Sequence, residues 1–180
     1  MSVSTYDVVL LIEQPLSLQD ARQVRGLHDE VDARVRYHVL LPVEDAAARV
    51  ESSMGSVAAG EVLASPALVL GEQDLEEMRH ELLDRARADL AACLDRLATV
   101  GADAVGDVVG QEPIDALAAK VGEVDAREAI ILTRPHVVAE FFHLDWTSRA
   151  RRRIGVPVLH LLEHETFGEQ AGGGEGVTGF

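Results

Sequence analysis

The sequence is poor in cysteine and lacks long apolar runs. Cys93 is the only cysteine, so no disulfide can form within the chain. No apolar run reaches the roughly 18 residues of a transmembrane helix, so we expect no membrane association. The opening residues, MSVSTYDVVLLIEQ, lack a basic leader and a small-residue cleavage site. These features together predict a reduced, cytoplasmic protein.

Positive charge is also scarce. The formal net charge is −15, with 31 acidic residues against 16 lysines and arginines, and Lys120 is the only lysine. This field would repel nucleic acid unless a basic patch offset it, and only Arg149 and Arg151 to Arg153 form such a patch. These arginines lie at the end of a predicted helix, where positive charge complements the helix dipole. They can therefore be explained without a ligand. We therefore expect no nucleic-acid partner.

Contiguous catalytic motifs are absent as well. The sequence has no serine hydrolase elbow, no Walker loop, no dinucleotide-binding Gly-x-Gly-x-x-Gly between a predicted strand and a helix, and no Cys-x-x-Cys. Catalytic residues need not be contiguous, so an enzyme is disfavoured rather than excluded. We assign no catalytic residue.

Short apolar runs alternate with helical patterns along the chain. The capping pair Ser17 and Asp20 opens a predicted helix that runs to about His28, and Glu72 to Val100 has the clearest helical periodicity, with Gly101 as its C-cap. Pro113 suits the first position of a third helix, and His136 to about Arg153 forms a fourth. The predicted strands are Tyr6 to Ile12, Val35 to Val43, Ala104 to Val109, Arg127 to Thr133 and Val156 to Leu162.

This alternation predicts an α/β three-layer sandwich around a five-stranded, mostly parallel sheet with right-handed crossovers. A chain of 180 residues favours one domain, which we place at residues 1–165. The region 44–71 is predicted to be a long loop, either functional or a surface insertion. The glycine-rich segment 166–180 is predicted to be a flexible tail.

Three local sequences resemble the universal stress protein family over residues 6 to 163. They are Gly101-Ala102-Asp103 with the later Gly110-Gln111-Glu112-Pro113, the strand Ala129-Ile130-Ile131-Leu132, and Val156-Pro157-Val158-Leu159. The resemblance implies an adenine nucleotide alpha hydrolase-like fold and a role in stress adaptation. It also implies a homodimer made by antiparallel pairing of the fifth strands.

Family members that bind ATP carry a Gly-x2-Gly-x9-Gly-Ser/Thr signature after the fourth strand. Its glycines would fall on Leu132, Pro135 and Asp145 here. Proline removes an N–H donor, and aspartate would repel phosphate. Glu13 or Gln14 lies near the first-strand aspartate that contacts nucleotide in the binders. We therefore expect no ATP and no other cofactor.

Residues around the end of the fourth strand could still bind a ligand. Thr133, Arg134 and His136 lie at the carboxyl end of a parallel strand, where open α/β sheets bind ligands. Together with Glu13, and with Gly110 to Pro113 and the 44–71 loop as further walls, they could hold a nucleotide or a small anion. The alternative, which we favour, is that Arg134 pairs with an acidic residue and His136 is solvated.

Another hypothesis is that the protein is a metal-dependent enzyme. His136, Glu140 and His143 occupy one face of the fourth predicted helix, which could ligate a metal. A catalytic site would also need second-shell support. We expect no metal.

The fifth predicted strand carries the expected dimer interface, Val156, Val158, His160 and Leu162. An exposed apolar edge strand is a liability that pairing would remove. His160 and His164 share one face, and we interpret them as structural rather than as a pH switch. The sequence thus favours a non-catalytic homodimer that acts through a protein partner or a small ligand.

Overall fold

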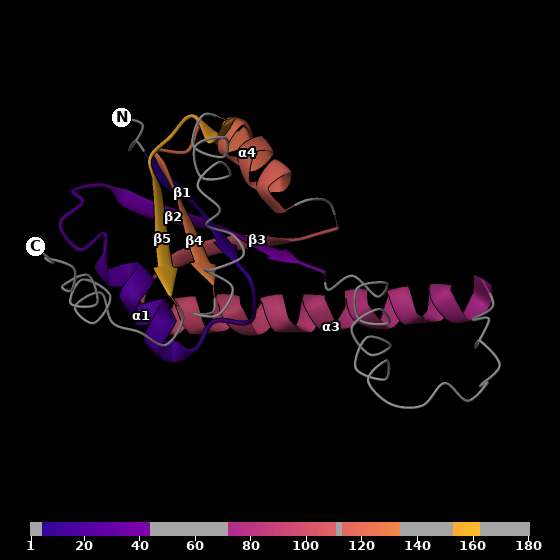
Figure 1. Ribbon diagram of the computed structural model, residues 1–180. Coiled ribbons are helices and arrows are strands. Elements are labelled where there is room, and N and C mark those ends of the chain that lie inside the picture. The colour runs from indigo at the N-terminus through magenta and orange to yellow at the C-terminus, as the bar shows by residue number, and fades with distance from the viewer. Residues whose placement is uncertain (1–4, 44–71, 111–112, 134–152, 163–180) are drawn as a thin grey trace, which may run out of the picture.

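The computed structural model of the chain describes residues 5–43, 72–110, 113–133 and 153–162. Its elements alternate as the sequence predicts (Figure 1). They are β1 (Thr5–Ile12), α1 (Leu18–Gly26), β2 (Arg34–Pro42), α3 (Glu72–Thr99), β3 (Asp103–Val109), α4 (Pro113–Val124), β4 (Glu128–Thr133) and β5 (Val158–Leu162). The predicted loop 44–71, most of the predicted helix from His136 and the predicted tail lie outside the described residues.

The five strands form one sheet in the order β3-β2-β1-β4-β5, and every neighbouring pair is parallel. α1 and α3 lie on one face of this sheet and α4 lies on the other (Figure 1). The predicted three-layer α/β architecture is confirmed. None of the helices in the described part of the chain is long and apolar enough to cross a membrane.

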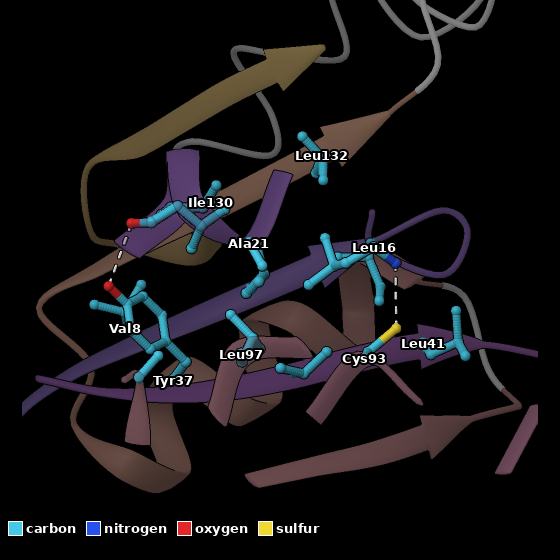
Figure 2. Packing of buried hydrophobic residues seen from close by; sticks show 14 of the residues in the cluster. Val8, Leu16, Ala21, Tyr37, Leu41, Cys93, Leu97, Ile130 and Leu132 are labelled. Atoms are coloured by element: carbon cyan, nitrogen blue, oxygen red, sulfur yellow. Dashed lines mark hydrogen bonds between the residues drawn. The ribbon is translucent and has the colours of Figure 1, made fainter. Parts of the chain in front are cut away.

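Alternation along β1 shows how the two faces are buried. Val8, Leu10 and Ile12 pack in the cluster formed with α1 and α3, whereas Val9 and Leu11 pack in the cluster formed with α4. All five side chains are buried, as expected for a central strand of a parallel sheet. Figure 2 shows the first cluster, where Cys93 of α3 approaches the start of α1 and its Sγ accepts a hydrogen bond from the N–H of Leu16 at 3.2 Å.

The predicted start of α1 is confirmed in detail. The Ser17 side chain accepts a hydrogen bond from the N–H of Asp20 at 3.1 Å, and the Asp20 carboxylate accepts one from the N–H of Ser17 at 2.9 Å. This capping box satisfies two N–H groups that the first turn of a helix leaves without partners. It fixes where the chain leaves β1 and enters α1.

Gly106 has a packing role in β3. A methyl group at this position would lie 2.7 Å from Cδ1 of Leu90 and 3.1 Å from the carbonyl oxygen of Val39. Its missing side chain therefore lets α3 pack closely against the sheet.

β5 starts two residues later than predicted. Pro157 has no N–H to donate to a strand ladder, so regular pairing begins at Val158. The carbonyl oxygen of Pro157 still accepts a hydrogen bond from the N–H of Ala129 at 2.9 Å. Val156, a predicted interface residue, therefore precedes the strand and packs partly buried against the cluster under α4.

Candidate functional site

The strand order defines one place in the sheet where a ligand is expected. From β1 the chain crosses through α1 to β2 on one side, whereas β4 lies on the other side of β1. The connections that leave the carboxyl ends of β1 and β4 therefore run in opposite directions. Open α/β sheets bind their ligands outside the strand ends at such a topological switch point.

Two of the predicted site residues lie at this point. Glu13 directly follows β1, and its N–H donates a hydrogen bond to the carbonyl oxygen of Leu132 at 3.1 Å. Thr133 is the last residue of β4 and is buried. The structure thus brings together two positions that are 120 residues apart in the sequence.

The other predicted residues are more distant or lie outside the described part of the chain. Gly110 follows β3, which is separated from β1 by β2, so it lies farther along the same edge of the sheet. Arg134 and His136 are outside the described residues, and so are Glu140 and His143 of the metal hypothesis. Among the residues that are described, no cluster of three potential metal ligands occurs.

Thr133 has a partner on the neighbouring edge strand. Its Oγ1 lies 2.7 Å from Nε2 of His160 on β5. Desolvation by burial lowers the pKa of His160 below its ordinary value, because the charged ring is disfavoured away from water. From the sequence, His160 was expected to be a structural residue at the dimer interface; the structure also joins it to the candidate ligand site.

Leu132 shows why a glycine loop cannot start where the family signature would place it. The residue lies within β4, is 1% exposed and packs in the core on the side of α1 and α3. Its side chain fills space that a glycine would leave empty. Pro135 and Asp145, the other two signature positions, are outside the described residues.

A buried polar cluster lies toward the amino-terminal ends of the strands, opposite the candidate site, and was not predicted from the sequence. His28, after α1, contacts the Glu128 carboxylate through Nε2, and its Nδ1 lies 2.8 Å from the hydroxyl of Tyr37. Tyr37 is fully buried, and burial raises the pKa of its phenol well above the usual range. His28 and Glu128 are 100 residues apart, so no sequence motif joins them. The cluster ties α1, β2 and β4 together and is remote from Thr133.

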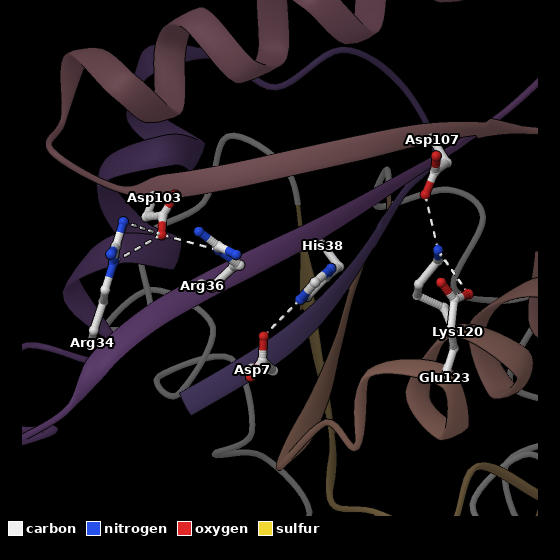
Figure 3. Close-up of polar contacts among 8 residues, drawn as sticks. All are labelled: Asp7, Arg34, Arg36, His38, Asp103, Asp107, Lys120 and Glu123. Carbon is white, nitrogen blue, oxygen red and sulfur yellow. Dashed lines mark hydrogen bonds and ion pairs between the residues drawn. The ribbon is translucent and has the colours of Figure 1, made fainter. Parts of the chain in front are cut away.

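A second polar cluster covers part of the sheet face on the side of α4. Arg34 and Arg36 of β2 share the carboxylate of Asp103, and Figure 3 shows His38 beside Asp7 and Lys120 between Asp107 and Glu123. Each of these basic side chains has a carboxylate within 3.1 Å. These contacts neutralise one another, so the cluster is better explained by structure than by ligand binding.

Neither a scan against protein-family models nor a search of curated proteins finds a match. Solved structures do match. The hypothetical protein MJ0577 is 12% identical, with a TM-score of 0.56 over 89% of this chain and 99% of that one. A universal stress protein family protein from Arabidopsis thaliana, At3g01520, solved with AMP bound, is 11% identical, with a TM-score of 0.51 over 88% of this chain and 92% of that one.

The structural similarity extends over nearly the whole length of both neighbours. The sequence identities are so low that the similarity shows the fold alone. It coincides with the parallel five-stranded sheet and with the family resemblance read from the sequence. This chain therefore has the fold of the universal stress proteins.

Proposed function

We propose that the protein is a non-catalytic, homodimeric binding module that receives a nucleoside monophosphate at the switch point between β1 and β4. The observation that carries this proposal is the juxtaposition of Glu13 and Thr133 at the ends of these two strands. The solved neighbour from Arabidopsis holds AMP, which supports this class of ligand.

The chemistry of the two residues suits a ligand with both a sugar and a phosphate. The hydroxyl of Thr133 can donate a hydrogen bond to a phosphate oxygen. The carboxylate of Glu13 can accept hydrogen bonds from ribose hydroxyls, as acidic residues do in other nucleotide-binding α/β folds. A bare anion would be repelled by Glu13, so a nucleoside monophosphate fits this pair better than free phosphate.

A triphosphate fits the sequence less well. Leu132 fills core space where the family's ATP signature has its first glycine, and Pro135 cannot donate an N–H to phosphate. The net charge of −15 also opposes the approach of a highly charged anion more than that of a monophosphate.

Native mass spectrometry tests the ligand. The protein, purified without added nucleotide, is measured alone, with AMP and with Mg-ATP, and we expect an adduct with AMP and none with ATP. Thr133→Val should lose the AMP adduct. Thr99→Val serves as the matched control, because the Thr99 hydroxyl makes an exposed hydrogen bond within α3. A specific ATP adduct, or an AMP adduct that survives in Thr133→Val, would contradict the proposal.

The two outermost strands of the sheet, β3 and β5, differ in a way that supports dimerisation through β5. β3 carries Asp103 and Asp107 on either side of Val105, so an antiparallel pair of β3 strands centred on Val105 would place carboxylates opposite one another. β5 has the sequence VLHLL and carries no Asp, Glu, Lys or Arg. Charged residues protect edge strands from pairing, and only β3 has this protection.

A pair of variants separates the two edges. Val158→Asp gives β5 the kind of charge that β3 carries, and we expect it to convert the dimer to a monomer in multi-angle light scattering. Val105→Asp places the same charge on β3, where Val105 is 45% exposed, and should leave the dimer intact. Circular dichroism checks that both variants fold. A wild-type monomer, or a dimer that is lost in Val105→Asp and not in Val158→Asp, would refute the interface.

A further inference from the structure

The contact between Thr133 and His160 has two hydrogen-bonding arrangements. When Nε2 of His160 is unprotonated it accepts the Thr133 proton, and the hydroxyl oxygen can then only accept a hydrogen bond from a ligand. When Nε2 carries a proton it donates to Oγ1, and the Thr133 proton becomes available to donate elsewhere. A neutral ring can adopt either arrangement, depending on its tautomer, whereas the protonated ring can only donate through Nε2. Protonation of the ring therefore fixes the Thr133 hydroxyl as a donor at the end of β4.

We propose that His160 is a positioning residue that couples the switch-point site to proton uptake: the protonated ring holds Thr133 as a donor to the phosphate of the ligand. This inference rests on the proposed nucleotide site and adds its regulation by pH. The imidazolium also attracts the phosphate directly, since Nε2 lies only 2.7 Å from the hydroxyl that would contact it.

The sign of the effect follows from linkage. Burial lowers the pKa of His160, because it favours the neutral ring. A phosphate beside Thr133 favours the charged ring and raises that pKa. A ligand that raises a pKa binds more tightly to the protonated protein, so the affinity should rise as the pH falls through the pKa that His160 has in the complex.

The titratable groups on neighbouring elements leave His160 as the described group best placed to produce this effect. Ile131 of β4 lies beside it in register, and Glu128, the titratable residue of β4, is at the far end of that strand in contact with His28. Glu13, after β1, is a carboxylate at the same edge of the sheet. The remaining charged groups on β1 and α4 are engaged elsewhere: Asp7 with His38, Asp115 with Arg153, and Lys120 with Asp107 and Glu123.

Isothermal titration with AMP at pH 5.5 and pH 7.5 tests the inference. We expect binding about tenfold tighter at the lower pH, a coupling of about 1.4 kcal/mol. His160→Gln keeps a hydrogen-bonding side chain that cannot take up a proton, so the ratio between the two pH values should fall to the value that the ionisation of the AMP phosphate alone produces. His80→Gln, at an exposed position on α3, serves as the matched control and should keep the wild-type ratio.

The ionisation of the AMP phosphate is common to all variants, so the comparison between them isolates His160. Binding with the same pH ratio in wild type and His160→Gln would overturn the role of His160 and leave the proposed function standing. Absence of AMP binding at both pH values would overturn both.

Discussion

Replacing Gly106 by alanine should destabilise the fold, because the close contact between α3 and β3 leaves no room for a methyl group. The added carbon would lie 2.7 Å from Leu90 and 3.1 Å from the backbone oxygen of Val39. The Leu90 side chain can rotate away, but the carbonyl of Val39 is part of the central sheet. The variant must therefore displace α3 or deform the ladder between β2 and β3.

The magnitude follows from two opposing terms. Overpacking a dense core costs about 1–3 kcal/mol. Alanine also restricts the unfolded chain more than glycine does, which returns about 0.4–1 kcal/mol. We expect Gly106→Ala to lower the free energy of unfolding by about 1–2 kcal/mol. With an m-value of about 2 kcal/mol per molar urea, the midpoint should fall by roughly 0.5–1 M.

Urea unfolding followed by circular dichroism measures this shift. Gly122→Ala provides the matched control, since Gly122 is exposed in α4 and nothing lies within 4 Å of its added methyl group. Alanine in a helix is favoured over glycine by about 0.5–1 kcal/mol, so this control should become more stable. If Gly106→Ala is as stable as the wild type, the close packing of α3 against β3 is refuted.

Three further predictions concern other contacts in the described structure. Ser17→Ala removes the cap of α1 and should lower the free energy of unfolding by about 1 kcal/mol in the same assay; no change would refute the capping role. Burial raises the pKa of the Cys93 thiol, so a thiol reagent should label it only when urea unfolds the protein, and rapid labelling of the folded protein would show that the core is open. Burial likewise raises the phenol pKa values of Tyr6 and Tyr37, so the stability they contribute is present below pH 10 and is lost as the pH rises above it. Their ultraviolet titration should show less phenolate at pH 10 than free tyrosine, which is half ionised there, and a titration like that of free tyrosine would contradict the raised pKa values.

The elements of the fold were predictable because their signals are local. Ser17 and Asp20 lie three residues apart, and their side chains form the predicted cap. Gly101 ends α3 with a φ of 77°, a conformation that glycine adopts without strain. The apolar run of β1 indicated a strand buried on both faces, and its side chains are buried on both faces.

Long-range arrangements could not be predicted in the same way. Nothing in the sequence shows that Gly106 lies under Leu90. The contact between His28 and Glu128 spans 100 residues and depends on the order of the strands in the sheet. Such pairs become visible only when the topology brings β4 beside β1.

The candidate site was predictable in part. Thr133 and Glu13 could be selected because the carboxyl ends of parallel strands are where ligands bind, and the strand order places both at the switch point. The link from Thr133 to His160 could not be predicted, since it depends on the register in which β5 pairs with β4. The sequence had suggested a structural and interface role for His160 rather than a pH switch.

The most direct test of the ligand site is an AMP titration of isotopically labelled protein followed by amide chemical shifts. The account predicts that the changes concentrate at Glu13, Leu132 and Thr133, at the carboxyl edge of β1 and β4. Unchanged signals at these residues in saturating AMP, or changes centred on His28 and Glu128 at the opposite edge, would contradict it.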